Sequence, residues 1–162
     1  MTELTPIGTA TGIKSPLLHL SQDAQLALKT KQGRPHVLCE MRITDDNSKP
    51  VPHDGQSVGH LQVRGPAVVE RYLGMSKPAV DAEGWFDTGD VANIDRWGYM
   101  SITDRSKDVI KSGGEWISSI EIENLAMSHS AVAEAAVVAI PSPRWGERPL
   151  LVVALKPVSA GR

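Results

Sequence analysis

The sequence has one cysteine, Cys39, and it has no long apolar run and no long block of like charge. A single cysteine excludes an internal disulfide and fits a reducing compartment, so a cytoplasmic location is expected. No apolar run approaches the ~20 residues that a membrane-spanning helix needs, so no transmembrane segment is expected. The N-terminus also lacks the basic region followed by a hydrophobic region that marks a secretory signal.

Charge and histidine content exclude further classes of site. The net charge is -2 at pH 7 and the charges are dispersed, so neither nucleic acid nor a membrane surface is expected as a partner. The histidines are scattered without metal-ligand spacing. A length of 162 residues fits one domain or parts of two.

The first half of the sequence predicts a small antiparallel β unit. Residues 1–36 contain several glycines and prolines and are expected to be rich in loops. In the first predicted strand Val37, Cys39, Met41 and Ile43 share one face, because side chains alternate along a strand. The four strands expected here cover residues 37–44, 58–65, 86–95 and 98–103.

The pattern changes after Arg105, where the sequence predicts a hairpin and then a helix. Gly113 and Gly114 supply the positive φ angles of a tight turn. Ser118 lies three residues before Glu121, which is capping-box spacing, and this predicts a helix through about residue 129. Its buried stripe is expected at Ile122, Leu125 and Ala126.

Two continuous apolar runs follow, at residues 132–140 and 150–155. Such runs are typical of strands that are covered on both faces, and residues 141–149 are expected to form the connecting loop. The fold class is therefore expected to be α+β, with a small antiparallel β unit followed by an incomplete α+β lobe.

Four residues are candidates for contacts with an anionic or hydroxylated ligand. Asp90 follows a Thr-Gly pair, and its carboxylate can accept hydrogen bonds from two adjacent hydroxyls; an ordinary β-turn is the alternative. Arg105 offers a planar fork for oxygen ligands, unless it forms a surface ion pair. Thr2 and Glu3 pair a hydroxyl with a carboxylate that can hold Mg²⁺, unless the N-terminus is unheld chain.

Taken together, three segments resemble the adenylate-forming superfamily of acyl-CoA synthetases. They read "MTELTPIGT", "GWFDTGDVANIDRWGYMSITDRSKDVIKSGGEWISSIEIEN" and "HSAVAEAAVVAIPSPRWGERPLLVVALKP". The second is most similar to bacterial medium-chain fatty acyl-CoA synthetases and 3-methylthiopropionyl-CoA ligases. The resemblance implies a reaction in which a fatty acid attacks ATP to give an acyl-adenylate and pyrophosphate, after which coenzyme A displaces AMP. ATP or AMP, coenzyme A and Mg²⁺ are the implied cofactors.

The same resemblance implies roles for the candidate residues. By position, Thr2 lies near the phosphates, Glu3 holds Mg²⁺, and Asp90 binds both ribose hydroxyls. Arg105 adds a ribose contact, and Lys107 is the hinge about which the C-terminal domain rotates between the two half-reactions.

Three more positions match elements of the thioester-forming step. Lys111 matches a lysine used in that conformation, and Gly113 and Gly114 match the loop that approaches coenzyme A. Trp116 stands where the coumarate ligases have glutamine, so the role of that glutamine is not carried over.

The implied domains are residues 1–104 from the large adenylation domain, a hinge at 105–107, and residues 108–162 from the mobile C-terminal domain. The family's phosphate loop and its adenylation lysine are expected outside this stretch, so the chain alone is expected to be inactive. A stand-alone nucleotide-binding or regulatory module, and a non-catalytic piece without ligand, are the alternatives.

Overall fold

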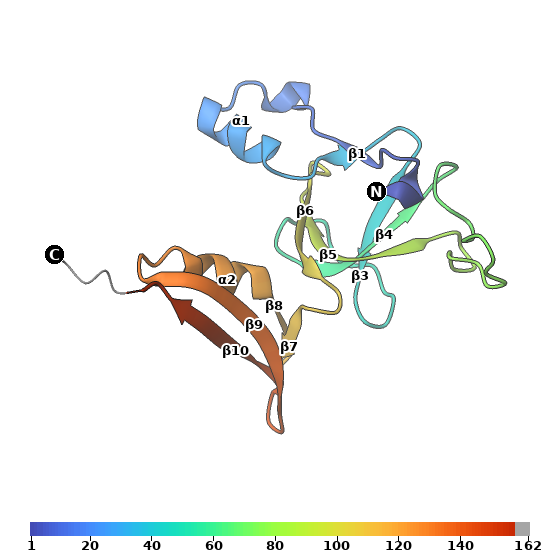
Figure 1. The fold of residues 1–162 in the computed structure, drawn as a ribbon. Helices are drawn as coiled ribbons and strands as arrows, with labels where there is room; N and C mark the ends of the chain where they lie inside the picture. Colours follow the sequence, from blue (N-terminus) through green and yellow to red (C-terminus); the bar gives the residue numbers. More distant parts are fainter. Residues whose placement is uncertain (158–162) are drawn as a thin grey trace. The chain divides into compact units, whose positions relative to one another are not determined.

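The computed structural model describes residues 1–157 and divides into two compact units, Met1–Ile102 and a second unit from Thr103 to the C-terminus. Within the described residues, mostly antiparallel sheets are combined with two α-helices (Figure 1), so the predicted α+β class is confirmed. None of the helices described is both long and apolar enough to cross a membrane.

A four-stranded sheet in the order β3-β4-β5-β6 forms the frame of the first unit. Strand β4 alternates between buried and half-buried side chains along its whole length, because one face of the sheet carries the core. β3 pairs antiparallel with β4, and β4 with β5. The strands are β3 (Glu40–Thr44), β4 (Val58–Arg64), β5 (Phe86–Ile94) and β6 (Met100–Arg105).

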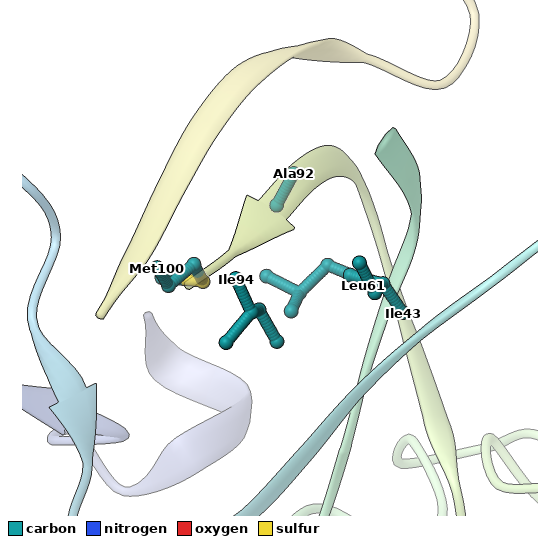
Figure 2. Packing of buried hydrophobic residues seen from close by; sticks show 5 residues of the cluster. All are labelled: Ile43, Leu61, Ala92, Ile94 and Met100. Carbon is teal, nitrogen blue, oxygen red and sulfur yellow. The ribbon is translucent and has the colours of Figure 1, made fainter. Parts of the chain in front are cut away.

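The core of this sheet is a cluster of five apolar side chains contributed by all four strands. Figure 2 shows that they face one another: Ile43, Leu61, Ala92, Ile94 and Met100. None of them is more than 4% exposed. Burying a large apolar side chain stabilises the fold by roughly 1.5–3 kcal/mol. This cluster therefore holds β5, the strand that carries Asp90, in the middle of the sheet.

The first predicted strand is wrong at its start. The Cys39 N–H donates to the His36 carbonyl at 2.9 Å, and this turn directs Val37 outward, where it is 88% exposed. The strand therefore begins at Glu40. Ile43 lies in the core as the alternation predicts.

Residues 1–36 are rich in loops as expected, but they also contain a helix that the sequence analysis did not predict, α1 (Gln22–Lys29). The Ser21 hydroxyl accepts the Ala24 N–H at 3.3 Å and caps this helix. No residue of α1 is buried, and the helix lies in a segment whose glycines and prolines predict loops. Four short elements complete the segment: 3-10 helices η1 (Thr2–Leu4) and η2 (Ser15–Leu17), and the paired strands β1 (Thr9–Ala10) and β2 (Arg34–Pro35).

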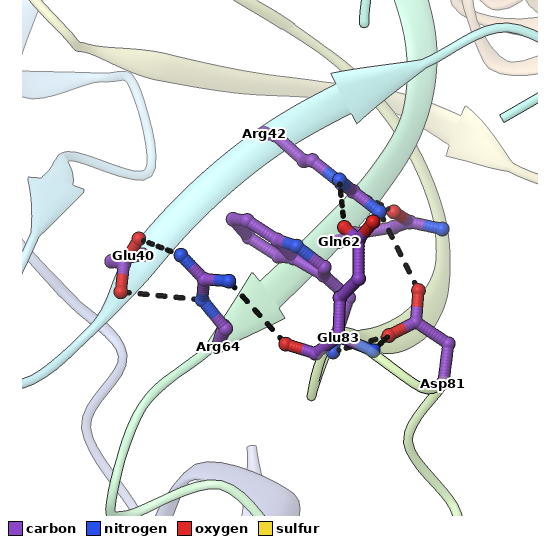
Figure 3. A network of polar contacts seen from close by, with 7 residues as sticks. Glu40, Arg42, Gln62, Arg64, Asp81 and Glu83 are labelled. Atoms are coloured by element: carbon purple, nitrogen blue, oxygen red, sulfur yellow. Dashed lines mark hydrogen bonds and ion pairs between the residues drawn. The ribbon is translucent and has the colours of Figure 1, made fainter. Parts of the chain in front are cut away.

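A network of charges fixes the chain just before β5. The guanidinium carbons of Arg42 and Arg64 lie 4.2 and 4.5 Å from the centre of the Trp85 ring, which is itself buried. Glu83 joins the two arginines, since its carboxylate pairs with Arg42 at 3.3 Å and its carbonyl accepts from Arg64 at 3.3 Å. Arg64 also pairs with Glu40 at 2.7 Å (Figure 3). The turn that leads into β5 is thereby held against the sheet.

Tyr99 connects the N-terminal segment to the same unit. Its side chain is fully buried, and its hydroxyl donates to the Gly12 carbonyl at 2.8 Å while it accepts the Lys14 N–H at 3.0 Å. Both backbone groups are far from Tyr99 in sequence, so this hydroxyl holds two distant segments together.

In the second unit the sheet order is β8-β7-β10-β9, and α2 packs mainly on β9. The predicted hairpin is confirmed: Gly113 and Gly114 have φ angles of 61° and 91° between β7 and β8. The predicted cap is confirmed as well, because the Ser118 hydroxyl accepts the Glu121 N–H at 3.2 Å. The elements are β7 (Ile110–Ser112), β8 (Glu115–Ile117), α2 (Ser119–Met127), β9 (Val132–Ser142) and β10 (Gly146–Leu155).

Three expectations for this unit are wrong. Residues 141–149 are not one long loop, since β9 runs to Ser142 and β10 begins at Gly146. Leu125 is 74% exposed and does not join a buried stripe. The two apolar strands are not covered on both faces, because α2 packs on one side of the sheet and Val152 remains 55% exposed.

We expect Tyr99→Phe to lower the free energy of unfolding of the first unit by about 1–3 kcal/mol, because it leaves a partly buried carbonyl and N–H without their partner. Urea unfolding and amide exchange at Lys14 measure this effect. Tyr72→Phe is the matched control, since Tyr72 is 47% exposed. Equal losses in the two variants would contradict the anchoring role of Tyr99.

Candidate functional site

Asp90 lies within a bulge of β5 rather than in a turn at the end of a strand. His60 of β4 pairs with Val91 of β5, and Gln62 pairs with Asp87. One residue, Leu61, lies between the two positions on β4, but three residues lie between them on β5. Gly89, the middle residue of the three, has a φ of 71°. A bulge of this kind changes the direction in which the following side chain points.

The bulge keeps its backbone groups hydrogen-bonded while it buries the Asp90 side chain. The Thr88 hydroxyl donates to the Leu61 carbonyl at 3.1 Å and accepts the Asp90 N–H at 3.2 Å. Asp90 is only 9% exposed. The "TGD" sequence thus has a structural reason for each residue: a hydroxyl that bonds the partner strand, a glycine for the positive φ, and a carboxylate directed inward.

Asp90 faces a cavity of about 330 Å³ whose wall is mainly apolar. Desolvation, and next the negative charge of Glu40, raises the pKa of the Cys39 thiol in this wall. The thiol is therefore protonated at neutral pH, and Asp90 supplies the carboxylate of the cavity. Leu4, Cys39, Met41, Leu61, Val63, Thr88, Met100 and Ile102 are among the other lining residues.

Thr2 and Glu3 lie in η1, and this part of the chain is held in place, contrary to the expectation of an unheld N-terminus. Leu4 is buried, and the Glu3 carbonyl accepts the Val69 N–H at 2.8 Å. The Tyr72 hydroxyl donates to Glu3 Oε1 at 3.2 Å. Desolvation, followed by this bond to Glu3, raises the pKa of Tyr72.

Glu3 and Asp90 open onto different cavities of the first unit. Thr2, Glu3 and Tyr72 line a cavity of about 420 Å³ that does not include Asp90 among its lining residues. Leu4, which follows Glu3, lines the Asp90 cavity instead. The structure therefore groups Thr2 with Glu3, and gives Asp90 an apolar cavity of its own.

Arg105 and Lys107 lie in the second unit, on a cavity of about 480 Å³ that is also lined by Asp104, Asp108 and Ser119. A turn follows Arg105, because its carbonyl accepts the N–H groups of Asp108 and Val109 at 3.0 Å each. The predicted hinge, residues 105–107, is thus a turn that leads directly into β7.

Lys111, Gly113 and Gly114 lie together on the β7–β8 hairpin. The ammonium group of Lys111 is 4.6 Å from the centre of the Trp116 ring, and its backbone N–H donates to Glu147 at 2.8 Å. Trp116 thus makes a cation–π contact with Lys111 across the hairpin.

Trp145 is a part of this cluster that the sequence does not reveal. The Gly113 N–H donates to the Trp145 carbonyl at 2.8 Å, and a Cβ at Gly113 would lie 2.7 Å from the indole. The Trp145 ring therefore covers Gly113. The two residues are 32 positions apart, and no local pattern links them.

Within the described residues, no group of three or more histidine, cysteine, aspartate or glutamate side chains is placed to hold a metal ion. Glu3 is a single carboxylate, which suits Mg²⁺ only when most of its other ligands are water or phosphate oxygens.

Residues 121–161 match the family model for the AMP-binding enzyme C-terminal domain. Over 152 residues the chain is 49% identical to 3-methylmercaptopropionyl-CoA ligase of Ruegeria pomeroyi, covering 94% of this chain and 28% of the relative. It is 47% identical over 156 residues to long-chain-fatty-acid–CoA ligase of Thermus thermophilus, covering 94% of this chain and 29% of that one. The chain belongs to the adenylate-forming superfamily.

Solved structures agree with this membership. o-Succinylbenzoate CoA synthetase from Bacillus subtilis, in complex with its acyl-adenylate intermediate, is 35% identical with a TM-score of 0.69, covering 87% of this chain and 29% of that one. The same enzyme with ATP and magnesium ion gives a TM-score of 0.68. The chain spans less than a third of the length of these adenylate-forming proteins.

We expect Gly113→Ala to displace the Trp145 indole, because the added Cβ has no room beside it. Gly114→Ala is the matched control: its φ is also positive, but nothing lies within 4 Å of its Cβ position. The two variants therefore share backbone strain, which costs about 1–2 kcal/mol, and only the first changes the NMR signal of the Trp145 indole N–H. When Trp145 is also replaced by alanine, Gly113→Ala should lower stability no more than Gly114→Ala does. An unchanged indole signal in Gly113→Ala would show that Trp145 does not cover the glycine.

Proposed function

We propose that this chain is the part of a fatty acyl-CoA ligase that binds the ribose of ATP and carries the hinge and the coenzyme A loop. The full reaction converts ATP, a carboxylic acid and coenzyme A into acyl-CoA, AMP and pyrophosphate through an acyl-adenylate. The observation that carries the proposal is the buried carboxylate of Asp90, which a glycine bulge directs into a mainly apolar cavity.

A buried carboxylate suits a vicinal diol. Its two oxygens can each accept a hydrogen bond, and a bond to a charged acceptor contributes about 1.5–3 kcal/mol. Asp90 is already largely removed from water in the structure, so a sugar hydroxyl displaces little solvent when it binds. Asp90 is therefore proposed to hold both ribose hydroxyls, and Arg105 to add a contact to the same sugar.

Glu3 is proposed as the residue that holds Mg²⁺ together with the nucleotide phosphates, with Thr2 beside a phosphate. The residues present fit this group, because one carboxylate and a neighbouring hydroxyl are what Mg²⁺ uses when phosphates supply other ligands. When bound, the ion neutralises phosphate charge. Tyr72 keeps the Glu3 side chain oriented through its 3.2 Å bond.

Residues 105–107 are proposed as the hinge, with Lys107 as the pivot, and residues 1–104 and 108–162 as the two domain portions that it joins. Lys111, Gly113 and Gly114 are proposed to act in thioester formation. Trp145 covers Gly113, but nothing lies within 4 Å of the Cβ position of Gly114, so a thiol substrate can approach the backbone of the β7–β8 turn closely there.

The acid is proposed to be a medium- or long-chain fatty acid or 3-methylthiopropionate, because the relatives at 47–49% identity are named for such acids. The single cysteine supports the further proposal that the enzyme acts in the cytoplasm.

A chimera tests the proposal. The chain replaces the matching stretch of the Ruegeria ligase, to which it is 49% identical, and acid-dependent exchange of pyrophosphate into ATP is measured. We expect the chimera to catalyse exchange and Asp90→Ala to weaken ATP use at least about tenfold, the equivalent of ~1.4 kcal/mol. The isolated chain, which spans under a third of the relative, should show no exchange.

Asp23→Ala serves as the control in the chimera, because Asp23 is an exposed carboxylate in the first turn of α1. It should leave ATP use unchanged. A folded chimera without exchange activity, or equal effects of Asp90→Ala and Asp23→Ala, would contradict the proposal. Binding of AMP by the isolated chain would instead favour a stand-alone nucleotide-binding module.

A further inference from the structure

Asp104 is nearly inaccessible to solvent, and both of its carboxylate oxygens accept hydrogen bonds. It is 1% exposed. Oδ1 accepts the Arg105 N–H at 2.8 Å, and Oδ2 accepts the Ser119 N–H at 2.7 Å and the Ser119 hydroxyl at 2.9 Å. Beside this group, the Ser118 hydroxyl donates to the Thr103 carbonyl at 2.8 Å. We call these bonds the Asp104–Ser119 latch.

The latch joins two points that lie on opposite sides of residues 105–107. Asp104 directly precedes this segment, whereas Ser119 is the first residue of α2. The chain between them, which includes the β7–β8 hairpin, forms a loop that the latch closes at its base. All of these residues belong to the second compact unit.

The latch does more than begin the helix. Ser118 already caps α2, because its hydroxyl accepts the Glu121 N–H. The Asp104 carboxylate comes from another element, the end of β6, and it accepts the first N–H of the helix in addition. Its bonds therefore connect β6 to α2, and they are of the stronger, charge-assisted kind.

We propose that Asp104 is a positioning residue that holds the segment 105–107 in one of its arrangements. This inference rests on the proposed function in taking Lys107 as the pivot. If the backbone rotates at Lys107, then α2 moves relative to Asp104 and the latch has to open. The latch therefore favours the arrangement in which it is closed, and it also fixes the backbone of Arg105.

The cavity at the base of the loop can supply hydrogen-bond partners to the Asp104 carboxylate when the latch is open. Asp104, Arg105, Lys107 and Ser119 all line this space of about 480 Å³. Water that enters it can hydrogen-bond the carboxylate once Ser119 has left, which a buried charge requires. The open arrangement is therefore accessible, and the latch sets how often it is populated.

Ser119→Pro removes both Ser119 donors and leaves the start of the helix intact. Proline is tolerated at the first helical position, and Ser118 has the extended conformation, φ -73° and ψ 123°, that a residue before proline prefers. Ser119→Ala removes the hydroxyl alone and keeps the N–H. Ser128→Ala, at the other end of α2, is the matched control.

Limited trypsin digestion of the full 162-residue chain measures the opening, because trypsin cleaves after Arg105 and Lys107, and none of the three substitutions changes the sequence around these bonds. We expect Ser119→Pro to accelerate cleavage at these two bonds at least about tenfold, the change expected from losing one charge-assisted bond. Ser119→Ala should have a smaller effect, and Ser128→Ala none. Unchanged cleavage after Arg105 and Lys107 in folded Ser119→Pro would overturn the proposal.

A second measurement separates positioning from general stability and holds even if Ser119→Pro does not fold. In Asp104→Asn, amide exchange should accelerate at Arg105 and Ser119, while the amides of β9 and β10 exchange as in the unsubstituted chain. A uniform acceleration across the whole second unit would show that Asp104 only stabilises the fold. Neither experiment uses nucleotide or acid, so both can fail independently of the proposed function.

Discussion

The structure depends on one constraint in the first unit: β5 has to be a central strand of a buried sheet and also present a carboxylate. The cluster around Ile94 fixes the end of the strand, and the charge network around Trp85 fixes its beginning. Between these points Gly89 permits a bulge, and Asp90 turns into a cavity without loss of the sheet. The Asp90 carboxylate is thus buried and lines a mainly apolar cavity.

The second unit is held by contacts between residues that lie far apart in the sequence. Its hairpin is stabilised by contacts from a distant turn, chiefly the packing of Trp145 on Gly113. Within this unit the carboxylate of Asp104 accepts both donors of Ser119 and so joins the end of β6 to the start of α2.

Local signals in the sequence were sufficient wherever local forces decide the structure. The glycine turn at 113–114, the Ser118 cap and the alternation of β4 all depend on neighbours within a few residues. Predictions from the sequence were wrong or absent where packing between distant parts of the chain determines the structure. Helix α1 buries no residue and lies in a segment rich in glycine and proline. The exposure of the β9–β10 sheet depends on what packs against it. The Asp104–Ser119 contact spans 15 residues and has no local signature.

The same difference between local and long-range signals applies to the candidate site. Asp90 was predicted from a compact motif, "TGD", whereas the support that Tyr72 gives to Glu3 links residues 69 positions apart. The central claim, that Asp90 binds ribose, is tested most directly by a crystal structure of the chimera with AMP. The account predicts that both ribose hydroxyls lie within about 2.5–3.2 Å of the Asp90 carboxylate oxygens. Bound AMP whose ribose is contacted by other residues, with Asp90 still facing an empty cavity, would contradict it.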